Sequence, residues 1–317
     1  MDILKLKPVL KDYIWGGERL KTDFGFESDL EKVAEGWMLS CHKDGKSTVD
    51  GGEYNGQTLD DIIQKLGKEK IVGTRSLDFP YFPVLIKLID AKDNLSIQVH
   101  PDNDYAQKVE GEFGKTEIWY VLDAADDAQL IYGFKKEITS DEFKQAIEDN
   151  TLLDVLNSVK VKKGDLFFIE AGTVHAIGKG TLIAEIQQNS NSTYRVYDYG
   201  RLGADGKPRE LHIKKAVDVS VTKPPKYDNK PMGEPQDMGG YISTLLTKCD
   251  LFTVNHYQIK STAEFETNEK SFHHILVIGG KGKMNGKDMK KGDSFFVPAN
   301  YGSYTVEGEC EILITEI

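Results

Sequence analysis

Val161-Lys-Lys-Gly-Asp-Leu-Phe-Phe-Ile-Glu-Ala-Gly172 occurs a second time in the chain, in altered form, as Met289-Lys-Lys-Gly-Asp-Ser-Phe-Phe-Val-Pro-Ala-Asn300. Both copies contain Lys-Lys-Gly-Asp-x-Phe-Phe, followed by an aliphatic residue, a variable residue and Ala. A repeat at this separation indicates two copies of one architecture. The copies differ just beyond the repeat, where His175 in the first aligns with Ser303 in the second. We therefore expect only the first copy to carry out chemistry.

Short apolar runs around the two copies predict that this architecture is built from β-strands. The runs are rich in β-branched and aromatic residues and are bounded by Gly, Asp, Asn or Lys, which is typical of a sandwich or barrel. The predicted strands cover residues 82–89, 95–100, 117–122, 165–169, 181–186, 273–278 and 294–297.

Helices are predicted as insertions into the first copy. Residues 58–66 begin with a Thr suited to an N-cap and have apolar residues three or four positions apart. A similar pattern covers 140–147 and continues through 151–156, and a weaker helix is expected over 211–217.

A proline-rich segment divides the chain. Residues 223–235 contain four of its ten prolines, and proline cannot donate the hydrogen bond that a central strand requires. We place a linker there. The expected domains are residues 1–235, with the helical insertions and a metal site, and residues 236–317, without a metal site.

Composition excludes several classes of protein. The chain has 317 residues, 29% of them charged, and no run of eighteen apolar residues, so we expect no membrane-spanning helix. A net charge of −11 without a basic tract argues against a nucleic-acid partner. The first residues do not resemble a secretory signal, and three widely spaced cysteines fit a reduced, cytoplasmic protein. An anionic ligand would need a locally positive site.

Side chains suited to a metal ion gather on the predicted strands. Gln98 and His100 are two residues apart on one strand and so share a face. Glu117 opens another strand, with Lys115 two residues before it, and His175 follows a tight turn. Two imidazoles, a carboxylate and an amide would suit a divalent ion with an open coordination position. Taken singly, a strand histidine is more often a hydrogen-bonded core residue than a ligand.

The spacing of these residues resembles that of the cupins. Residues 164–175 follow the pattern Gly-x5-Glu-x-Gly-x2-His, which resembles the second cupin motif with Glu170 in the usual place of Pro. Residues 98–117 resemble the first motif, with Gln replacing one His. Residues 292–298 keep the Gly and Pro of the second motif, but no His follows. We therefore expect an all-β protein of two cupin-like (double-stranded β-helix, or jelly-roll) barrels, with helical insertions in the first.

A closer resemblance is to the short bacterial form of type I mannose-6-phosphate isomerase, and it spans nearly all of the chain. The segments that carry it are Tyr13-Ile-Trp-Gly-Gly17, Leu95-Ser-Ile-Gln-Val-His-Pro-Asp102, Gly114-Lys-Thr-Glu-Ile-Trp-Tyr120, Glu170-Ala-Gly-Thr-Val-His-Ala176 and Asn191-Ser-Thr-Tyr-Arg-Val-Tyr-Asp-Tyr-Gly-Arg201.

This resemblance implies a cytoplasmic enzyme with one zinc ion per chain and a phosphorylated hexose as substrate. Arg195 matches the family's essential arginine, and Lys115 and Glu185 match polar residues of its substrate pocket. Ser96 matches a serine near the expected phosphate position. The residues that match the family's zinc ligands are Gln98, His100, Glu117 and His175.

Interconversion of mannose 6-phosphate and fructose 6-phosphate moves a proton between C1 and C2 through a cis-enediol. The reaction needs a base, a cation near the developing oxyanion and a cationic clamp for the phosphate. Arg195 could stabilise the enediolate, and Lys115, Ser96 or Arg201 could hold the phosphate. Glu185 could be the base if burial raises its pKa, and Lys115 could be the base if neighbouring zinc lowers its pKa. Zinc-bound water is a third alternative, and we favour Glu185.

Other interpretations stay open at this point. Arg195 has three tyrosines near it in the sequence and could stack on them as a structural residue. Rival functions are another metal-dependent cupin enzyme (a different sugar-phosphate isomerase or an oxygenase) and a sugar-binding cupin without activity. The sequence does not indicate the oligomeric state.

Overall fold

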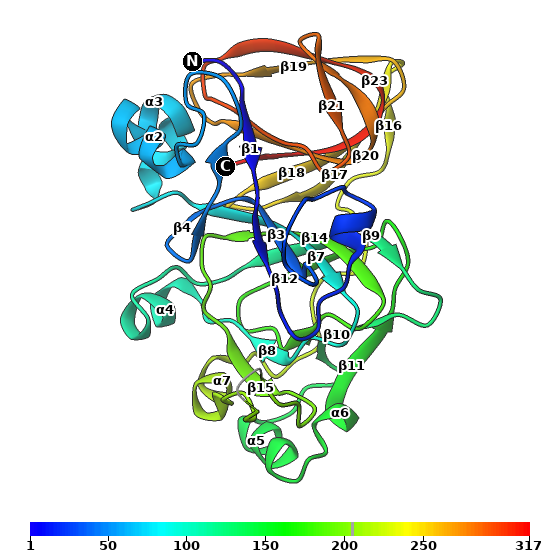
Figure 1. The fold of residues 1–317 in the computed structure, drawn as a ribbon. Coiled ribbons are helices and arrows are strands. Elements are labelled where there is room, and N and C mark those ends of the chain that lie inside the picture. The colour runs from blue at the N-terminus through cyan, green and yellow to red at the C-terminus, as the bar shows by residue number, and fades with distance from the viewer. Residues whose placement is uncertain (204–205) are drawn as a thin grey trace.

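Two β-barrels pack against each other in the computed structural model, which describes residues 1–203 and 206–317 (Figure 1). The chain is all-β with cupin-like barrels and helical insertions, as the sequence predicted.

The first barrel consists of two antiparallel sheets that enclose one apolar cluster. The six-stranded sheet has the order β12 (Leu166–Ile169), β9 (Glu117–Ala124), β14 (Thr181–Gln188), β7 (Val84–Ala91), β3 (Glu35–Leu39) and β2 (Val9–Lys11). The five-stranded sheet has the order β11 (Leu156–Lys160), β10 (Gln129–Phe134), β13 (His175–Ala176), β8 (Ile97–Val99) and β15 (Tyr194–Tyr197). A separate hairpin joins β4 (Cys41–His42) and β5 (Gly45–Lys46).

The second barrel is one ten-stranded sheet that includes two strands from the start of the chain. Its main path is β16 (Gln236–Asp237), β17 (Tyr241–Lys248), β18 (Thr253–Ile259), β23 (Gly302–Glu316), β20 (His273–Met284), β22 (Ser294–Val297), β1 (Leu4–Lys7) and β6 (Thr48–Val49). The remaining strands are β19 (Thr262–Thr267), beside β23, and β21 (Lys287–Lys290), beside β20.

The helices lie outside the barrels. In Figure 1, α2 and α3 flank the second barrel, α4 lies at the side of the first, and α5 to α7 lie at its far end. None of the helices in the described part of the chain has the length and apolar character needed to cross a bilayer. Their bounds are α1 (Arg19–Thr22), α2 (Leu59–Leu66), α3 (Lys68–Val72), the 3-10 helix η1 (Thr74–Asp78), α4 (Asn103–Val109), α5 (Ser140–Glu148), α6 (Leu152–Val155) and α7 (Ile213–Val219).

Strand alternation explains how the first barrel places a few polar groups in an interior that is otherwise apolar. In β14, Leu182 and Ile186 face the core shared with the second barrel, whereas Ile183 and Glu185 face the interior of the first. All eight residues of β14 are buried because both of its faces are covered. The polar interior positions are therefore fixed by period two within strands that look almost uniformly apolar.

The predicted strands and helices are confirmed with shifted ends, except that the helix expected to continue from 140–147 through 151–156 is broken into α5 and α6 at Asn150, which has positive φ. Strand 273–278 extends to Met284, and the weak helix begins at Ile213. The helix predicted from residue 140 is capped one residue earlier, by the Thr139 side chain in a capping box with Glu142. Residues 223–235 contain no helix or strand.

The repeated sequence builds the same local structure twice. Gly164 and Gly292 both have positive φ, 90° and 92°, at the turn before β12 and β22. The next residue is an aspartate in both copies, and its carboxylate accepts a hydrogen bond from a backbone N–H, at 3.0 Å for Asp165 and 2.9 Å for Asp293. This equivalence confirms two copies of one β architecture.

The second barrel has an aromatic interior where the first has polar groups. Ile169 and Val297 are equivalent positions of the repeat. Ile169 pairs with Glu117 and Val297 pairs with His273, so Glu117 and His273 occupy equivalent places in the two barrels. Tyr304 lies in the apolar interior of this barrel, and its Oη is 2.8 Å from Nδ1 of His273. The residue that points into the second barrel at this place is therefore Tyr304, and not Ser303, which the sequence repeat aligns with His175.

We predict that a protein truncated after residue 240 does not fold. The second barrel supplies Phe272, Phe296 and Leu313 to the core shared with the first barrel, and β1 would lose its partner β22. Each such side chain stabilises the fold by about 1.5–3 kcal/mol on burial. The measurement is solubility and circular dichroism of the truncated chain beside the full chain. A soluble, folded and active product would contradict this interdependence.

Candidate functional site

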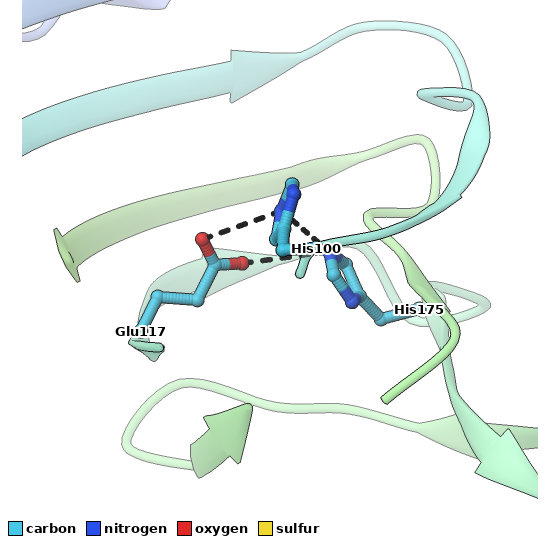
Figure 2. Close-up of side chains that lie close together, drawn as sticks. All are labelled: His100, Glu117 and His175. Carbon is cyan, nitrogen blue, oxygen red and sulfur yellow. Dashed lines mark hydrogen bonds and ion pairs between the residues drawn. The ribbon is translucent and has the colours of Figure 1, made fainter. Parts of the chain in front are cut away.

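Two histidines and a glutamate converge inside the first barrel (Figure 2). His100 follows β8, His175 lies in β13, and Glu117 opens β9 in the opposite sheet. The two Nε2 atoms are 3.1 Å apart, and Glu117 oxygens lie 3.7 Å from Nε2 of His100 and 3.6 Å from Nε2 of His175. All three residues are at most 1% exposed. In residues 1–203 and 206–317 they form the one such group suited to a metal ion.

Backbone carbonyls fix the protonation of both imidazoles. Nδ1 of His100 lies 2.9 Å from the carbonyl oxygen of Ser192, and Nδ1 of His175 lies 2.7 Å from that of Thr173. Because a carbonyl oxygen only accepts, each Nδ1 carries the proton and each Nε2 presents a lone pair. Burial lowers the pKa of His175 to about 3 and, with the nearby Lys115, lowers that of His100 well below its usual value. The two Nε2 atoms therefore face each other as acceptors, not as a hydrogen-bonded pair.

A cation satisfies this arrangement. The ammonium of Lys115 lies 3.1 Å from Nε2 of His100 and forms an ion pair with Glu117, so a positive group already sits against the cluster. Oε1 of Glu117 is buried without a hydrogen-bond partner among the described residues. Burial and the charge of Glu185 raise the pKa of Glu117 to about 7. These residues fit a divalent metal ion held by nitrogen and oxygen atoms.

Gln98 occupies the position expected of a fourth ligand. It is the cross-strand neighbour of His175 in the pairing of β8 with β13, so the two side chains share a face. Gln98 also lines the cavity next to the cluster. Its amide is therefore available to a metal ion or to a ligand in the cavity.

A cavity of about 310 Å³ opens beside the cluster, within the roughly 300–1,000 Å³ typical of small-molecule sites. Five of the residues singled out from the sequence line it, and Arg201 is not among its described lining residues. Those five are Ser96, Gln98, Lys115, Glu185 and Arg195.

Two lysines and a tryptophan hold the Glu185 carboxylate in the wall of the cavity. Its carboxylate lies 3.0 Å from the Lys87 ammonium and 3.7 Å from that of Lys115, and Nε1 of Trp119 donates to it at 2.9 Å. Burial alone would raise the pKa of Glu185, but the two lysines outweigh it and hold this pKa at about 2. Glu185 is therefore ionised, and the rise in its pKa that burial was expected to cause is not found, because the two lysines outweigh burial.

The two arginines predicted from the sequence have different surroundings. Arg195 is the cross-strand neighbour of Gln98, and burial together with the charges of Arg209 and Arg201 lowers its pKa. Its Nη1 donates to the carbonyl oxygen of Glu210 at 2.8 Å. Arg201 instead lies over the ring of Tyr199, 5.3 Å from its centroid. The tyrosine stacking considered for Arg195 is thus made by Arg201.

The sequence reasoning missed Lys87, Glu35 and Arg209, which all line the cavity. Burial alone would lower the pKa of Lys87, but Glu185 and Glu35 outweigh it and raise this pKa. A signal was present, since Lys87 and Glu185 are opposite charges that each interrupt an apolar run. The structure makes them direct cross-strand partners. Arg209 has no comparable signal, because it lies outside any strand.

Comparison with known proteins finds two family models. The model described as phosphomannose isomerase type I, catalytic domain, matches residues 3–131, and that of the mannose-6-phosphate isomerase cupin domain matches residues 241–317. Two curated relatives come from Bacillus subtilis (strain 168). The probable mannose-6-phosphate isomerase GmuF is 40% identical, with 98% of each chain covered. The mannose-6-phosphate isomerase ManA is 39% identical, with 99% of this chain and 98% of that protein covered.

Solved structures agree with these matches. The crystal structure of the mannose 6-phosphate isomerase from Bacillus subtilis has a TM-score of 0.92 and 36% identity, with all of both chains covered. A phosphomannose isomerase from Salmonella typhimurium has a TM-score of 0.77 at 18% identity, covering 99% of each chain, which shows the same fold.

We predict that replacing His175 with Ala, or Glu117 with Gln, lowers the affinity for a divalent metal by more than about 100-fold. Even the loss of a residue that only orients a ligand costs roughly 10- to 100-fold. Metal per chain, measured after dialysis against a weak chelator, tests this expectation. His256→Gln is the control, since His256 belongs to the contact between the barrels and not to the cluster. Full metal content in the His175 and Glu117 variants would contradict the site.

Proposed function

This chain belongs to the type I phosphomannose isomerase family, and from that premise we propose that it interconverts mannose 6-phosphate and fructose 6-phosphate with one bound zinc ion. Membership makes the chain an aldose–ketose isomerase, and not an oxygenase or a binding module. The observation that supports the metal is the pair of facing Nε2 lone pairs beside a buried carboxylate oxygen.

Gln98, His100, Glu117 and His175 would hold the zinc ion. Two neutral imidazoles, one carboxylate and one amide would leave the ion with a net positive charge. Zinc suits this donor set, and an isomerisation requires no redox change of the metal. When bound, zinc would supply Lewis acidity toward the oxygens of the sugar.

The chain's own residues would perform the remaining steps. Glu185 takes the proton from one carbon and returns it to the other, because its carboxylate is an acceptor-only group that lines the cavity. Arg195 stabilises the negative charge of the enediolate through its guanidinium. Lys115 can exchange a proton with a sugar oxygen, and Ser96 can donate a hydrogen bond to the phosphate.

Lys87 would keep Glu185 in place. The ion pair of 3.0 Å joins direct cross-strand partners, so the carboxylate cannot move far from the cavity wall. Because both groups are buried, loss of either charge would leave the other buried without a partner, which is strongly destabilising. Together with Trp119, this contact orients the proposed base toward the cavity.

We also propose the domain division at residues 235 and 236 and a cytoplasmic location. The family models leave residues 132–240 unmatched, and the linker segment 223–235 lies within that interval.

The proposed cytoplasmic location rests on the three free cysteines, which suit a reducing compartment.

We expect the purified protein to form fructose 6-phosphate from mannose 6-phosphate in a coupled assay. Chelation should abolish this turnover and added zinc should restore it, because the cluster then regains its cation. Absence of turnover in the fully metallated protein would refute the proposed function. Restoration by magnesium alone would refute the choice of zinc.

Glu185→Gln should retain zinc and lose most turnover, by about 10²–10⁴-fold in kcat, the contribution usual for a positioned base. The amide keeps the size of the side chain but cannot accept the proton. Zinc content and kcat are measured together on this variant and on Glu35→Gln. Wild-type kcat in Glu185→Gln would remove Glu185 from the role of base.

A further inference from the structure

The apolar core shared by the two barrels contains two polar side chains of the second barrel. His274 in β20 and Ser294 in β22 are both 0% exposed. Strand alternation turns them to the same face of their sheet as Leu276 and Phe296, which lie in this core. The Oγ of Ser294 donates to the carbonyl oxygen of Met38, in β3 of the first barrel, at 2.9 Å. The pair therefore bonds the second barrel to the first.

The direction of these hydrogen bonds is fixed. Nε2 of His274 lies 2.8 Å from Oγ of Ser294. The single hydroxyl proton is committed to the Met38 carbonyl, which only accepts, so His274 donates from Nε2. Burial lowers the pKa of His274 to about 3, and the neutral ring holds no second proton. Nδ1 is accordingly a buried acceptor without a hydrogen-bond partner among the described residues.

The first barrel shows that the architecture does not require this polar pair. Leu166 aligns with Ser294 in the repeat, and Ile118 is the counterpart of His274, one residue after the equivalent places described above. Both counterparts lie in the same shared core. A buried polar pair with an unpartnered nitrogen destabilises a core that an apolar pair would fill. The pair must therefore be explained by what it binds.

The carbonyl oxygen that Ser294 binds belongs to a β-bulge. The register of β3 against β7 shifts between Trp37 and Leu39, so Met38 is the extra residue. Met38 and Leu39 are adjacent, yet both face the shared core, which regular alternation would not allow. The extra residue of a bulge is left unpaired in the ladder. Because β3 lies on the side of the first barrel that faces the second, Ser294 can supply the missing partner (Figure 1).

The residue before the bulge supports the proposed base. The indole of Trp37 donates from Nε1 to the Glu35 carboxylate at 2.7 Å. Lys87 is the cross-strand partner of Trp37, and its ammonium lies 5.4 Å from the centre of the ring, within the range of a cation–π contact. Lys87 in turn forms the 3.0 Å ion pair with Glu185. A shift of the bulge would therefore move the lysine that holds the base.

We infer that His274 and Ser294 are positioning residues of the second barrel, which hold the bulge of β3 and through it the tryptophan and the lysine that support the proposed base. The inference rests on the proposed function and deepens it, since it gives the second barrel a part in the reaction. Neither residue lines the cavity in the described part of the chain. Their effect on turnover therefore passes through β3.

The kinetic test compares Ser294→Ala and His274→Leu with the wild-type holoenzyme. Each variant breaks the chain of hydrogen bonds, and we expect kcat to fall on the order of 10-fold, because a misplacement of about 1 Å costs about 10²-fold. KM and zinc content should be unchanged, since neither residue touches substrate or metal. His274→Gln should restore most of the loss, because its amide nitrogen can donate in place of Nε2.

Ser271→Ala is the matched control. Ser271 is buried in the same barrel, and its Oγ donates to the carbonyl oxygen of Phe272 at 3.0 Å without reaching the first barrel. We expect its kcat to be that of the wild type. An equal fall in kcat in this control, or unchanged kcat in both Ser294→Ala and His274→Leu, would overturn the inference.

A double-mutant cycle shows whether the effect passes through the base. In the Glu185→Gln background, Ser294→Ala should lower kcat by less than about twofold, because no base remains to be positioned. A full 10-fold loss in that background would show that the two residues act independently, and so would contradict the inference.

The indole N–H signals in the NMR spectrum of the ¹⁵N-labelled protein separate this inference from the proposed function. The chain has three tryptophans, and the signal lost in Trp37→Phe identifies that of Trp37. It should shift in Ser294→Ala and His274→Leu and stay in place in Ser271→Ala, because its bond to Glu35 moves with the bulge. This pattern supports the inference even if the wild type shows no turnover, a result that overturns the proposed function alone. An unmoved Trp37 signal in both variants overturns the inference.

Discussion

Two imidazole lone pairs that face each other at 3.1 Å in a buried site are the constraint around which the first barrel is organised. Each histidine is fixed in this tautomer by a backbone carbonyl on its far nitrogen, so neither ring can relieve the repulsion by moving its proton. A carboxylate from the opposite sheet completes the group. A cation satisfies such an arrangement in a buried site: the ammonium of Lys115 lies against it, and a metal ion fits there.

The other charged side chains buried around the cavity pair with one another. Lys87, Lys115, Glu117 and Glu185 are each at most 5% exposed and are joined in one network of ion pairs. Burial and the charge of Glu185 raise the pKa of Glu117 to about 7, whereas Lys115 and Lys87 outweigh burial and lower the pKa of Glu185 to about 2. Two acids a short distance apart thus acquire different pKa values from burial and from the charges of their neighbours.

The two barrels share one architecture but differ in the side chains that fill their interiors. Equivalent turns at Gly164 and Gly292 lead into equivalent strands, yet the second barrel fills its interior with Tyr304 and His273 where the first places metal-binding groups. The second barrel is not independent of the catalytic one. Strand β1 crosses into its sheet, and its apolar side chains share a core with the outer face of β14 and β7. Its contribution is therefore to cover the sheet that carries Glu117, Lys87 and Glu185.

The sequence by itself determined the strands, the repeat and the set of candidate ligands, because these depend on local patterns. Period-two alternation places Gln98 with His100 and Lys115 with Glu117 whatever the rest of the chain does. The tertiary structure decided which distant residues meet. Strand register brought Lys87 opposite Glu185, and the return of segment 206–212 along β15 brought Arg209 into the cavity while Arg201 turned to Tyr199. These contacts depend on how the strands pair and how the segments between them fold back, and no local pattern encodes that geometry.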